Sequence, residues 1–130
     1  MIRYPSRPWT GCSQRPQTAR VDEEVIPVLR VRDAQDAAHW YRRLGFEHEW
    51  EHRFEPHLPA FVSVIRQGMR LFLSEHTGDA RRDTLLYLRV SAVDAVAAEF
   101  GVPVERAPWA REVELTDPDG NRLRIGTPSD

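Results

Sequence analysis

The sequence predicts an α+β fold made of two β-α-β-β-β modules, whose curved mixed sheets carry their helices on the outside. Three observations predict this fold. Apolar residues recur with strand and helix periods in a fixed order, turns rich in glycine and proline separate these segments, and the whole order occurs twice at a spacing of roughly 55 residues. We expect the modules at about residues 25–76 and 84–127, within one domain that covers residues 23–130.

The first module opens with the apolar, β-branched run VIPVLRV (residues 25–31), which predicts a strand. Asp33 follows, and it can cap a helix over residues 34–44. In that helix, apolar side chains recur at steps of three and four residues and predict one buried stripe, made of Ala37, Trp40, Tyr41 and Leu44. Gly45 is suited to end the helix.

The segment FEHEWEHRFE (residues 46–55) alternates strictly, which is the period of a strand. The alternation predicts a charged face and, opposite to it, a face of aromatic and His side chains, made of Phe46, His48, Trp50, His52 and Phe54. After a PHLP loop, two more strands are expected at residues 60–67 and 69–75, joined by a hairpin at Gly68.

The second module repeats this plan after a polar segment at residues 77–83. We expect a helix that Gly101 ends and a tight turn at the sequence DPDG. The helix is expected at residues 93–100, the turn at 117–120, and strands at 85–90, 102–105, 111–116 and 122–126. The letters also repeat, because LRV occurs at 29–31 and again at 88–90. This internal similarity favours a duplication of one module.

Charge and composition exclude several classes of function. The formal net charge is −2, and four of the 18 arginines fall in the first twenty residues, which contain no acid, so the rest of the chain is distinctly acidic. An acidic body disfavours nucleic acid as a partner and favours neutral or cationic ligands. Because the sequence contains no lysine, Schiff-base chemistry is excluded. It also lacks a Gly-rich phosphate loop and a recognisable Ser-His-Asp arrangement.

Residues 1–22 are rich in Pro and Arg, and we expect them to form a flexible tail, with an arm that clasps a partner subunit as the alternative. The tail lacks the apolar centre of a signal peptide, and no apolar run approaches the roughly 18 residues of a membrane span. Cys12 is the only thiol, so no intrachain disulfide can form. A cytoplasmic protein with no membrane partner is therefore expected.

Two segments carry a family resemblance. IPVLRVRDAQDAAHWYRRLGF (residues 26–46) resembles the opening module of the vicinal-oxygen-chelate superfamily, which includes glyoxalases and bleomycin resistance proteins, and LTDPDGNRLRIG (residues 115–126) resembles its closing hairpin. The resemblance covers about residues 25–127. It implies paired modules whose sheets curl into a cup, and often a homodimer with ligand sites where modules meet.

The resemblance also implies where a metal would bind. Enzymes of this superfamily hold a divalent metal with His or Gln on the first strand of each module and with Glu on a later strand of each. The matching positions fall at or near Ile26, Phe72, Leu85 and Arg124. Three of these side chains are apolar and the fourth is cationic, so only Glu75 is left as a ligand, and only if the register is displaced. We therefore expect no metal and no cofactor, as in the bleomycin resistance proteins, which have lost these ligands.

Aromatic side chains are the candidate binding groups, because flat apolar walls can stack on a heteroaromatic ligand. Trp50 and Trp109 stand at or near positions where bleomycin resistance proteins have aromatic residues. The candidate ligand-binding residues are Trp50, Phe54, His57, Phe61, Trp109 and Glu112, with no catalytic residue among them. Core packing is the rival interpretation for all four aromatic residues. It is favoured for Phe61, whereas a ligand or dimer contact is favoured for Trp109. Glu112 could attract a cationic group, although a solvated carboxylate is the favoured interpretation.

The sequence therefore favours a homodimer that binds and sequesters a small, aromatic and cationic antibiotic of the bleomycin type, conferring resistance without catalysis. We expect two equivalent pockets between the subunits, with Trp50 and Trp109 at or near them, because a second copy would cover concave aromatic faces that a small chain leaves exposed. The alternative is a superfamily enzyme, such as a glyoxalase, lyase or dioxygenase, acting on a small metabolite. A regulatory or scaffold domain is a third possibility.

Overall fold

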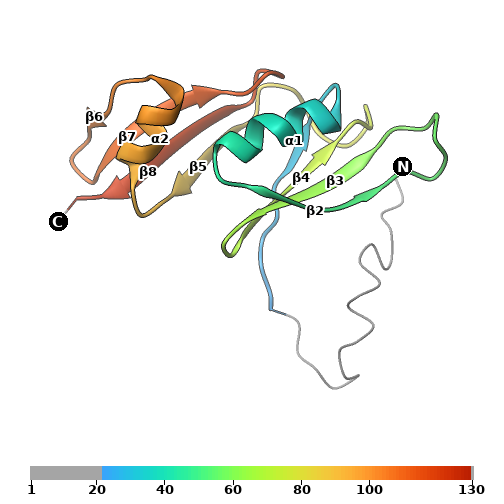
Figure 1. The fold of residues 1–130 in the computed structure, drawn as a ribbon, viewed down its shortest axis with the longest axis horizontal. Coiled ribbons are helices and arrows are strands. Elements are labelled where there is room, and N and C mark those ends of the chain that lie inside the picture. Colours follow the sequence, from blue (N-terminus) through green and yellow to red (C-terminus); the bar gives the residue numbers. More distant parts are fainter. Residues whose placement is uncertain (1–21, 130) are drawn as a thin grey trace.

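The structure is a computed structural model that describes residues 22–129 (Figure 1). The predicted tail lies outside the described residues except for Asp22. The first module comprises β1 (Val28–Arg30), α1 (Ala34–Arg43), β2 (Glu47–His52), β3 (Phe61–Arg66) and β4 (Met69–Ser74). The second comprises β5 (Leu85–Arg89), α2 (Val93–Phe100), β6 (Glu105–Arg106), β7 (Ala110–Thr116) and β8 (Arg122–Pro128). The predicted α+β fold of two β-α-β-β-β modules is confirmed.

Each module forms one four-stranded mixed sheet, with the strand orders β1-β4-β3-β2 and β5-β8-β7-β6. The first strand pairs in parallel with the last strand of its own module, and all other pairs are antiparallel. The registers of the two parallel pairs correspond, because Val28 lies opposite Phe72 just as Tyr87 lies opposite Arg124. The duplication seen in the letters is therefore also present in the backbone pairing.

Helix α1 begins at its predicted cap, where the Asp33 carboxylate accepts hydrogen bonds from the backbone N–H groups of Gln35 and Asp36, each at 3.0 Å. The chain leaves the helix through Gly45, which adopts a φ of +95° that few other residues tolerate. The predicted stripe faces the core, with Trp40 partly buried and the others buried: Ala37, Tyr41 and Leu44. Neither helix within residues 22–129 has the length and apolar character needed to cross a membrane.

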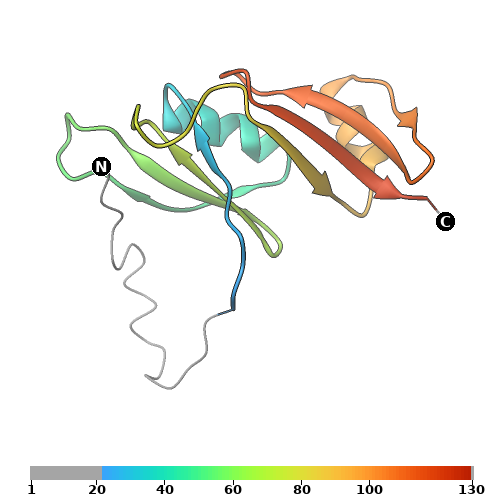
Figure 2. The ribbon, with the colours of Figure 1, turned by 180° about the vertical axis from the view of Figure 1, so that it is seen from behind.

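The two sheets lie side by side along the long axis of the molecule, and both helices lie on the same side of them. Figure 1 views the molecule from the helix side, and Figure 2, turned by 180°, shows the strands in front of the helices. The sheet sides that face the helices bury one continuous apolar core that spans both modules. We call the opposite sides the open faces of the first and the second sheet.

Polar contacts lock the two modules together at the DPDG turn. The buried Tyr41 hydroxyl donates a 2.7 Å hydrogen bond to the Asp117 carboxylate, which also accepts from the backbone N–H groups of Asp119 and Asn121. The side-chain amide of Asn121 reaches back to the Arg30 carbonyl on β1. The turn that closes the second module is thus hydrogen-bonded to the helix and the first strand of the first module.

The prediction that residues 46–55 form one evenly alternating strand is wrong. β2 has a bulge between His48 and Trp50, at which Glu49 has no paired residue on β3. The bulge reverses the alternation, so Phe46 belongs to the core on the helix side whereas Trp50 lies on the open face. The acidic face is split in the same way, because Glu51 bonds to α1 and Glu49 bonds across the open face.

Strand limits also differ from the prediction at two places. The first strand is shorter than residues 25–31, and the short strand expected at 102–105 is found at Glu105–Arg106. Val102 is not available for a strand ladder, because its N–H donates to the Ala97 carbonyl as the chain leaves α2.

Candidate functional site

The open face of the second sheet carries every second residue of its strands, while the alternate residues face the core. β5 contributes two exposed, largely apolar side chains, Leu85 and Tyr87. The neighbouring strands contribute charged and small residues to the same face: Arg122, Arg124 and Gly126 on β8, and Glu112, Glu114 and Thr116 on β7. In Figure 2 this face is turned toward the reader.

Trp109 is held at the edge of this face by a tight loop between β6 and β7. The loop is closed by reciprocal backbone hydrogen bonds between Ala107 and Ala110, at 2.8 and 3.3 Å. The Trp109 side chain is 64% exposed, which is unusual for so large an apolar group. Its Nε1 nevertheless donates a 2.7 Å hydrogen bond to Oε2 of Glu112, which favours one orientation of the ring.

Tyr87 donates to the same carboxylate oxygen from the other side. The distance from its hydroxyl to Oε2 of Glu112 is also 2.7 Å, and its side chain is 45% exposed. We call Tyr87, Glu112 and Trp109 together the carboxylate bridge. Two exposed aromatic rings are thus tied to one negative charge across the open face of the second sheet.

The hydrogen bonds of the bridge shift the pKa values of Glu112 and Tyr87. The hydrogen bond from Tyr87 and then that from Trp109 lower the pKa of Glu112. Burial opposes them, and the positive charge of Arg124 adds a lesser lowering effect. The bond to Glu112 is also the main cause that raises the pKa of the Tyr87 hydroxyl. At neutral pH, Glu112 is therefore ionised and Tyr87 is a hydrogen-bond donor.

The open face of the first sheet carries a layer of packed aromatic side chains. Trp50 stacks on Phe61 with ring centroids 6.0 Å apart and an angle of 15°, and Phe72 contacts both rings at 5.5 and 5.1 Å. Trp50 is 7% exposed and Phe61 is 2% exposed. The structure thus brings two of the predicted binding residues, Trp50 and Phe61, into one aromatic layer that Phe72 completes.

An ion-pair network borders this aromatic layer. Arg70 on β4 binds both oxygens of Glu49 at 2.9 Å and reaches Glu24 at 2.6 Å, while the buried Ser63 hydroxyl donates to Glu49 at 2.7 Å. Burial alone would raise the pKa of Glu49, but the hydrogen bonds from Arg70 and Ser63 and the charge of Arg70 lower it overall. Arg70 is therefore shared by two carboxylates, and the network keeps a net negative charge.

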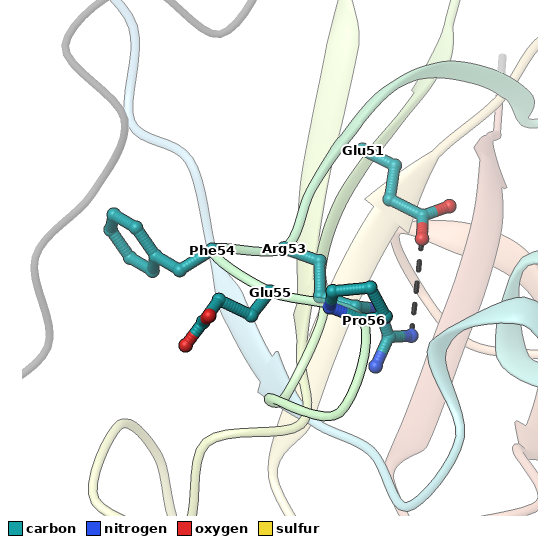
Figure 3. Close-up of a pocket in the computed structure, with 5 residues that line it drawn as sticks. All are labelled: Glu51, Arg53, Phe54, Glu55 and Pro56. Carbon is teal, nitrogen blue, oxygen red and sulfur yellow. Dashed lines mark ion pairs between the residues drawn. The ribbon is translucent and has the colours of Figure 1, made fainter.

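The loop between β2 and β3 forms a surface pocket of about 710 Å³, lined by Glu51, Arg53, Phe54, Glu55 and Pro56 (Figure 3). The Phe54 ring is 51% exposed, points away from Arg53 and meets His52 edge-to-face at 4.4 Å. His57, another predicted binding residue, lies in the same loop and is exposed. The structure thus places Phe54 and His57 together at the rim of the first sheet.

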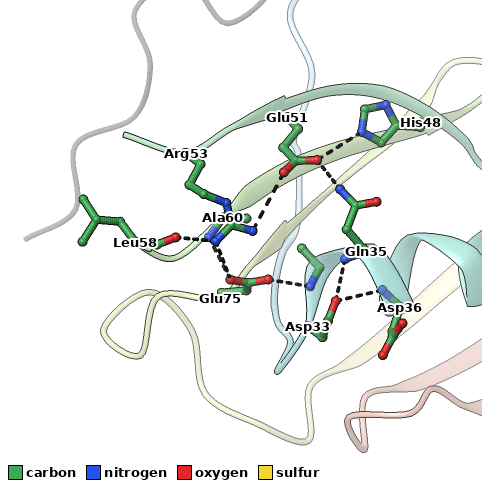
Figure 4. Close-up of polar contacts among 10 residues, drawn as sticks. Asp33, Gln35, Asp36, His48, Glu51, Arg53, Leu58, Ala60 and Glu75 are labelled. Atoms are coloured by element: carbon green, nitrogen blue, oxygen red, sulfur yellow. Dashed lines mark hydrogen bonds and ion pairs between the residues drawn. The ribbon is translucent and has the colours of Figure 1, made fainter. Parts of the chain in front are cut away.

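Glu75 has a structural role instead of a metal-binding one. Its carboxylate accepts hydrogen bonds from the backbone N–H of Ala34 at 2.8 Å and of Ala60 at 2.9 Å, and Arg53 lies 3.9 Å away (Figure 4). It therefore joins the start of α1 to the loop before β3. Glu75 was the one metal ligand that a displaced register would have left. Its carboxylate oxygens are thus already bound by backbone N–H groups of the protein.

The residues present do not fit the metal site of the superfamily enzymes. Phe72 and Arg124 stand at equivalent register positions of the two sheets, and Arg124 is itself next to Glu114 at 3.4 Å. Among residues 22–129, no three His, Cys, Asp or Glu side chains lie close enough together to hold a metal ion. The equivalent positions offer a ring and a cation, neither of which can coordinate a metal.

The predicted site residues fall into two separate groups. Trp50, Phe61, Phe54 and His57 belong to the first sheet and its loop, whereas Trp109 and Glu112 belong to the second sheet. Figure 1 places the loop between β2 and β3 and the strand pair β6–β7 at opposite ends of the long axis. Sequence reasoning missed Tyr87, although the alternation of the sequence LLYLR on β5 places Tyr87 opposite the core-facing Leu86 and Leu88.

Comparisons with solved structures show the same fold. TnmS3, described as an antibiotic binding protein from Streptomyces sp. CB03234, has 24% identity and a TM-score of 0.66, over 85% of this chain and 99% of that one. TioX from Micromonospora sp. ML1 has 16% identity and a TM-score of 0.71, over 83% and 100% of the two chains. A bleomycin-binding protein, solved in complex with bleomycin, has 20% identity and a TM-score of 0.63, again over 83% and 100%.

None of the curated proteins matches this chain. A family model described as "Glyoxalase superfamily protein" matches residues 16–130, which is most of the sequence and includes both modules. The family expectation drawn from the opening strand and helix and from the closing DPDG hairpin is therefore confirmed: the chain belongs to the glyoxalase superfamily.

Proposed function

We propose that this protein binds and sequesters a small aromatic, cationic molecule, such as an antibiotic of the bleomycin type, without transforming it. One observation carries the proposal: Trp109 offers a large, exposed ring that a hydrogen bond to Glu112 holds in place. A fixed flat wall beside a carboxylate suits a planar ligand with a positive charge, because stacking and charge attraction act on the same molecule. Binding of such ligands needs no reorganisation of the ring.

The chemistry of the remaining residues favours binding over catalysis. The four positions that hold the metal in superfamily enzymes carry Ile26, Phe72, Leu85 and Arg124, none of which can donate a lone pair to a metal at neutral pH. The similarity to proteins described as antibiotic binding and bleomycin-binding supports the same class of function. These comparisons establish the fold and nothing more, so the proposed ligand class rests on the residues of this chain.

We further propose that the functional unit is a homodimer in which the first sheet of one copy faces the second sheet of the other. Within one chain, the two groups of predicted site residues belong to different sheets, and the β2–β3 loop and the β6–β7 strands lie at opposite ends. A two-fold axis would bring Trp109 of each copy toward the aromatic layer of its partner and form two equivalent pockets. Sedimentation should give a dimer at micromolar concentration, and a monomer would contradict this geometry.

Ligand titration tests the binding function. The full chain is titrated with bleomycin and a panel of heteroaromatic antibiotics, and tryptophan fluorescence reports binding. We expect Trp109→Ala to weaken binding of the responding compound by about tenfold or more, because it removes a stacking wall. Trp40→Phe is the matched control, since Trp40 packs on Phe100 at the helix side, far from the open faces. A flat response across the panel would contradict the proposal.

Metal analysis tests the enzymatic alternative. The purified protein should contain no stoichiometric Ni, Mn, Fe or Zn, because the ligand positions are apolar or cationic. A bound metal that is lost on substitution of Glu75 or of a residue beside these positions would favour a superfamily enzyme instead.

A further inference from the structure

In the carboxylate bridge, two aromatic residues are hydrogen-bonded to one side chain, Glu112. Tyr87 comes from β5 and Trp109 from the loop before β7, and both donate to the same oxygen of Glu112, each at 2.7 Å. β8 lies between β5 and β7, so the bridge crosses a whole strand of the sheet. No residue in the described part of the chain donates a hydrogen bond to Oε1, the second oxygen of Glu112.

Gly126 on β8 makes this crossing possible. It pairs with Glu112 on one side and with Arg89 on the other, directly beneath the bridge. A Cβ atom at this position would lie 2.3 Å from the Tyr87 hydroxyl oxygen and 3.2 Å from Cγ of Glu112. The equivalent position in the first sheet, opposite Arg30, is occupied by Ser74. The space for the bridge is therefore present only in the second sheet.

The Glu112 carboxylate is ionised, and among the described residues it forms no direct ion pair. Arg89 and Arg124 face it from β5 and β8, and Glu105 and Glu114 face it from β6 and β7. Arg124 pairs with Glu114 at 3.4 Å and is thus engaged elsewhere. The donors that Glu112 does bind, a phenol and an indole, are both neutral. Its negative charge is consequently available to a ligand.

We propose that Tyr87 is a further ligand-binding residue and that Glu112, which offers Oε1 to the ligand, also positions Tyr87 and Trp109 as one aromatic surface. The proposal rests on the proposed binding function and specifies the ligand class. The ligand is a flat heteroaromatic ring that lies against Tyr87 and Trp109 and carries a protonated nitrogen or an N–H group directed at Oε1 of Glu112. Because the rings are already fixed, binding loses less side-chain entropy than it would with free rings.

The bridge itself can be tested without a ligand by NMR. The chain has four Trp residues, so the indole cross-peak of Trp109 is assigned by its disappearance in Trp109→Phe. In Glu112→Gln we expect this indole proton to move upfield and to exchange faster with water, because a charged acceptor is replaced by a weaker neutral one. An unchanged Trp109 cross-peak in Glu112→Gln would overturn the bridge.

A binding experiment with bleomycin as the probe tests the role of the bridge. We expect Tyr87→Ala to weaken binding about tenfold, Tyr87→Phe less than that, and Glu112→Gln about tenfold. Glu99→Gln is the matched control, because this exposed carboxylate pairs with Arg43 on the helix side, away from the bridge. Thermal melting confirms that each variant is folded.

The pH profile separates the role of the Glu112 carboxylate from general structural damage. Wild-type affinity should stay constant through neutral pH and fall only when Glu112 is protonated in the acidic range, whereas Glu112→Gln should bind weakly with a profile that lacks this step. Unchanged affinity in both Tyr87→Ala and Glu112→Gln, with wild-type binding intact, overturns this inference but leaves the proposed function standing. If the wild type binds neither bleomycin nor any compound of the panel, the proposed function fails together with the ligand role of Tyr87, and the NMR result still decides the bridge.

Discussion

The open faces of the two sheets differ, although the sheets share topology and register. On the first sheet, Trp50, Phe61 and Phe72 form a packed aromatic layer. On the second sheet, Phe72 is replaced at the equivalent register by Arg124, and the aromatic rings of Tyr87 and Trp109 are exposed and held by hydrogen bonds. The same backbone therefore carries one face ordered by ring packing and another ordered by polar contacts.

The helix-facing sides of the sheets have not diverged in this way. Leu29 lies opposite Leu73 in the first sheet, and Leu88 lies opposite Ile125 at the same register in the second. All four belong to the common core. Core positions tolerate only apolar side chains of similar volume, whereas the second open face, with its exposed Leu85, Tyr87 and Trp109, is free of that constraint. After duplication, the difference between the modules is thus concentrated on the surfaces where we propose that the ligand binds.

The largest effect expected from this comparison is on stability. Phe61→Ala should lower the free energy of unfolding by about 3–5 kcal/mol, because it leaves a cavity among packed rings. Trp109→Ala should change it by no more than about 0.5 kcal/mol, because that ring is mostly exposed. Urea unfolding followed by circular dichroism measures both. Similar losses in the two variants would mean that the faces are not ordered differently.

The next prediction concerns the contact that joins the modules. Tyr41→Phe should destabilise the protein by about 1–2 kcal/mol, because the buried Asp117 carboxylate loses its shortest hydrogen bond. Glu99→Gln removes an exposed ion pair with Arg43 at the same junction and should cost about 0.5 kcal/mol or less. Thermal unfolding of both variants provides the comparison, and an equal cost would assign no special role to the buried bond.

Much of the fold follows from local sequence signals. Asp33 caps α1, Gly45 ends that helix with a positive φ, and the DPDG turn forms where its letters predict it. These features depend on neighbouring residues, which the sequence displays directly. The absence of metal-binding side chains at Phe72 and Arg124 could also be read from the sequence, because the order of motifs determines the register.

The site could be predicted only in part, because its decisive features depend on contacts between distant residues. The bulge at Glu49 reverses the alternation of β2, and nothing in the letters FEHEWEHRFE reveals it. The sequence allows Glu112 to attract a cationic group or to be solvated, but its bonds to Tyr87 and Trp109 depend on pairing across β8. Gly126 looks like an ordinary strand residue until the Tyr87 hydroxyl is seen above it.

A substitution at Gly126 tests whether Tyr87 and Trp109 are coupled through Glu112 on the open face of the second sheet. Gly126→Ala should cost about 1 kcal/mol in stability and shift the Trp109 indole resonance, since the new methyl group displaces the Tyr87 hydroxyl. Gly68→Ala is the matched control, because a Cβ there meets no atom within 4 Å. If Gly126→Ala leaves the indole resonance at its wild-type position, Tyr87 is not coupled to Trp109.

The smallest expected effect distinguishes the carboxylates of the two faces. Glu49 and Glu112 both have a lowered pKa, Glu49 chiefly through hydrogen bonds and charge from Arg70 that outweigh the effect of burial, and Glu112 through neutral donors. A carboxylate with a lowered pKa contributes stability that is present above its unfolded-state pKa and is lost as the pH falls through its folded-state pKa.

Both contributions should therefore be complete at neutral pH and disappear in the acidic range. Glu49→Gln should cost up to about 1 kcal/mol at neutral pH, since its partly exposed ion pair with Arg70 is screened by water, and the cost should shrink in about 1 M salt. The upfield shift of the Trp109 indole in Glu112→Gln should persist at that salt concentration, because a neutral indole donor is not an ion pair. Unfolding of Glu49→Gln and NMR of Glu112→Gln, each at low and high salt, measure the two effects. If salt reduced the indole shift as strongly as the Glu49→Gln cost, the charge of Arg124 would be the true partner of Glu112, and the two faces would be ordered by the same kind of interaction.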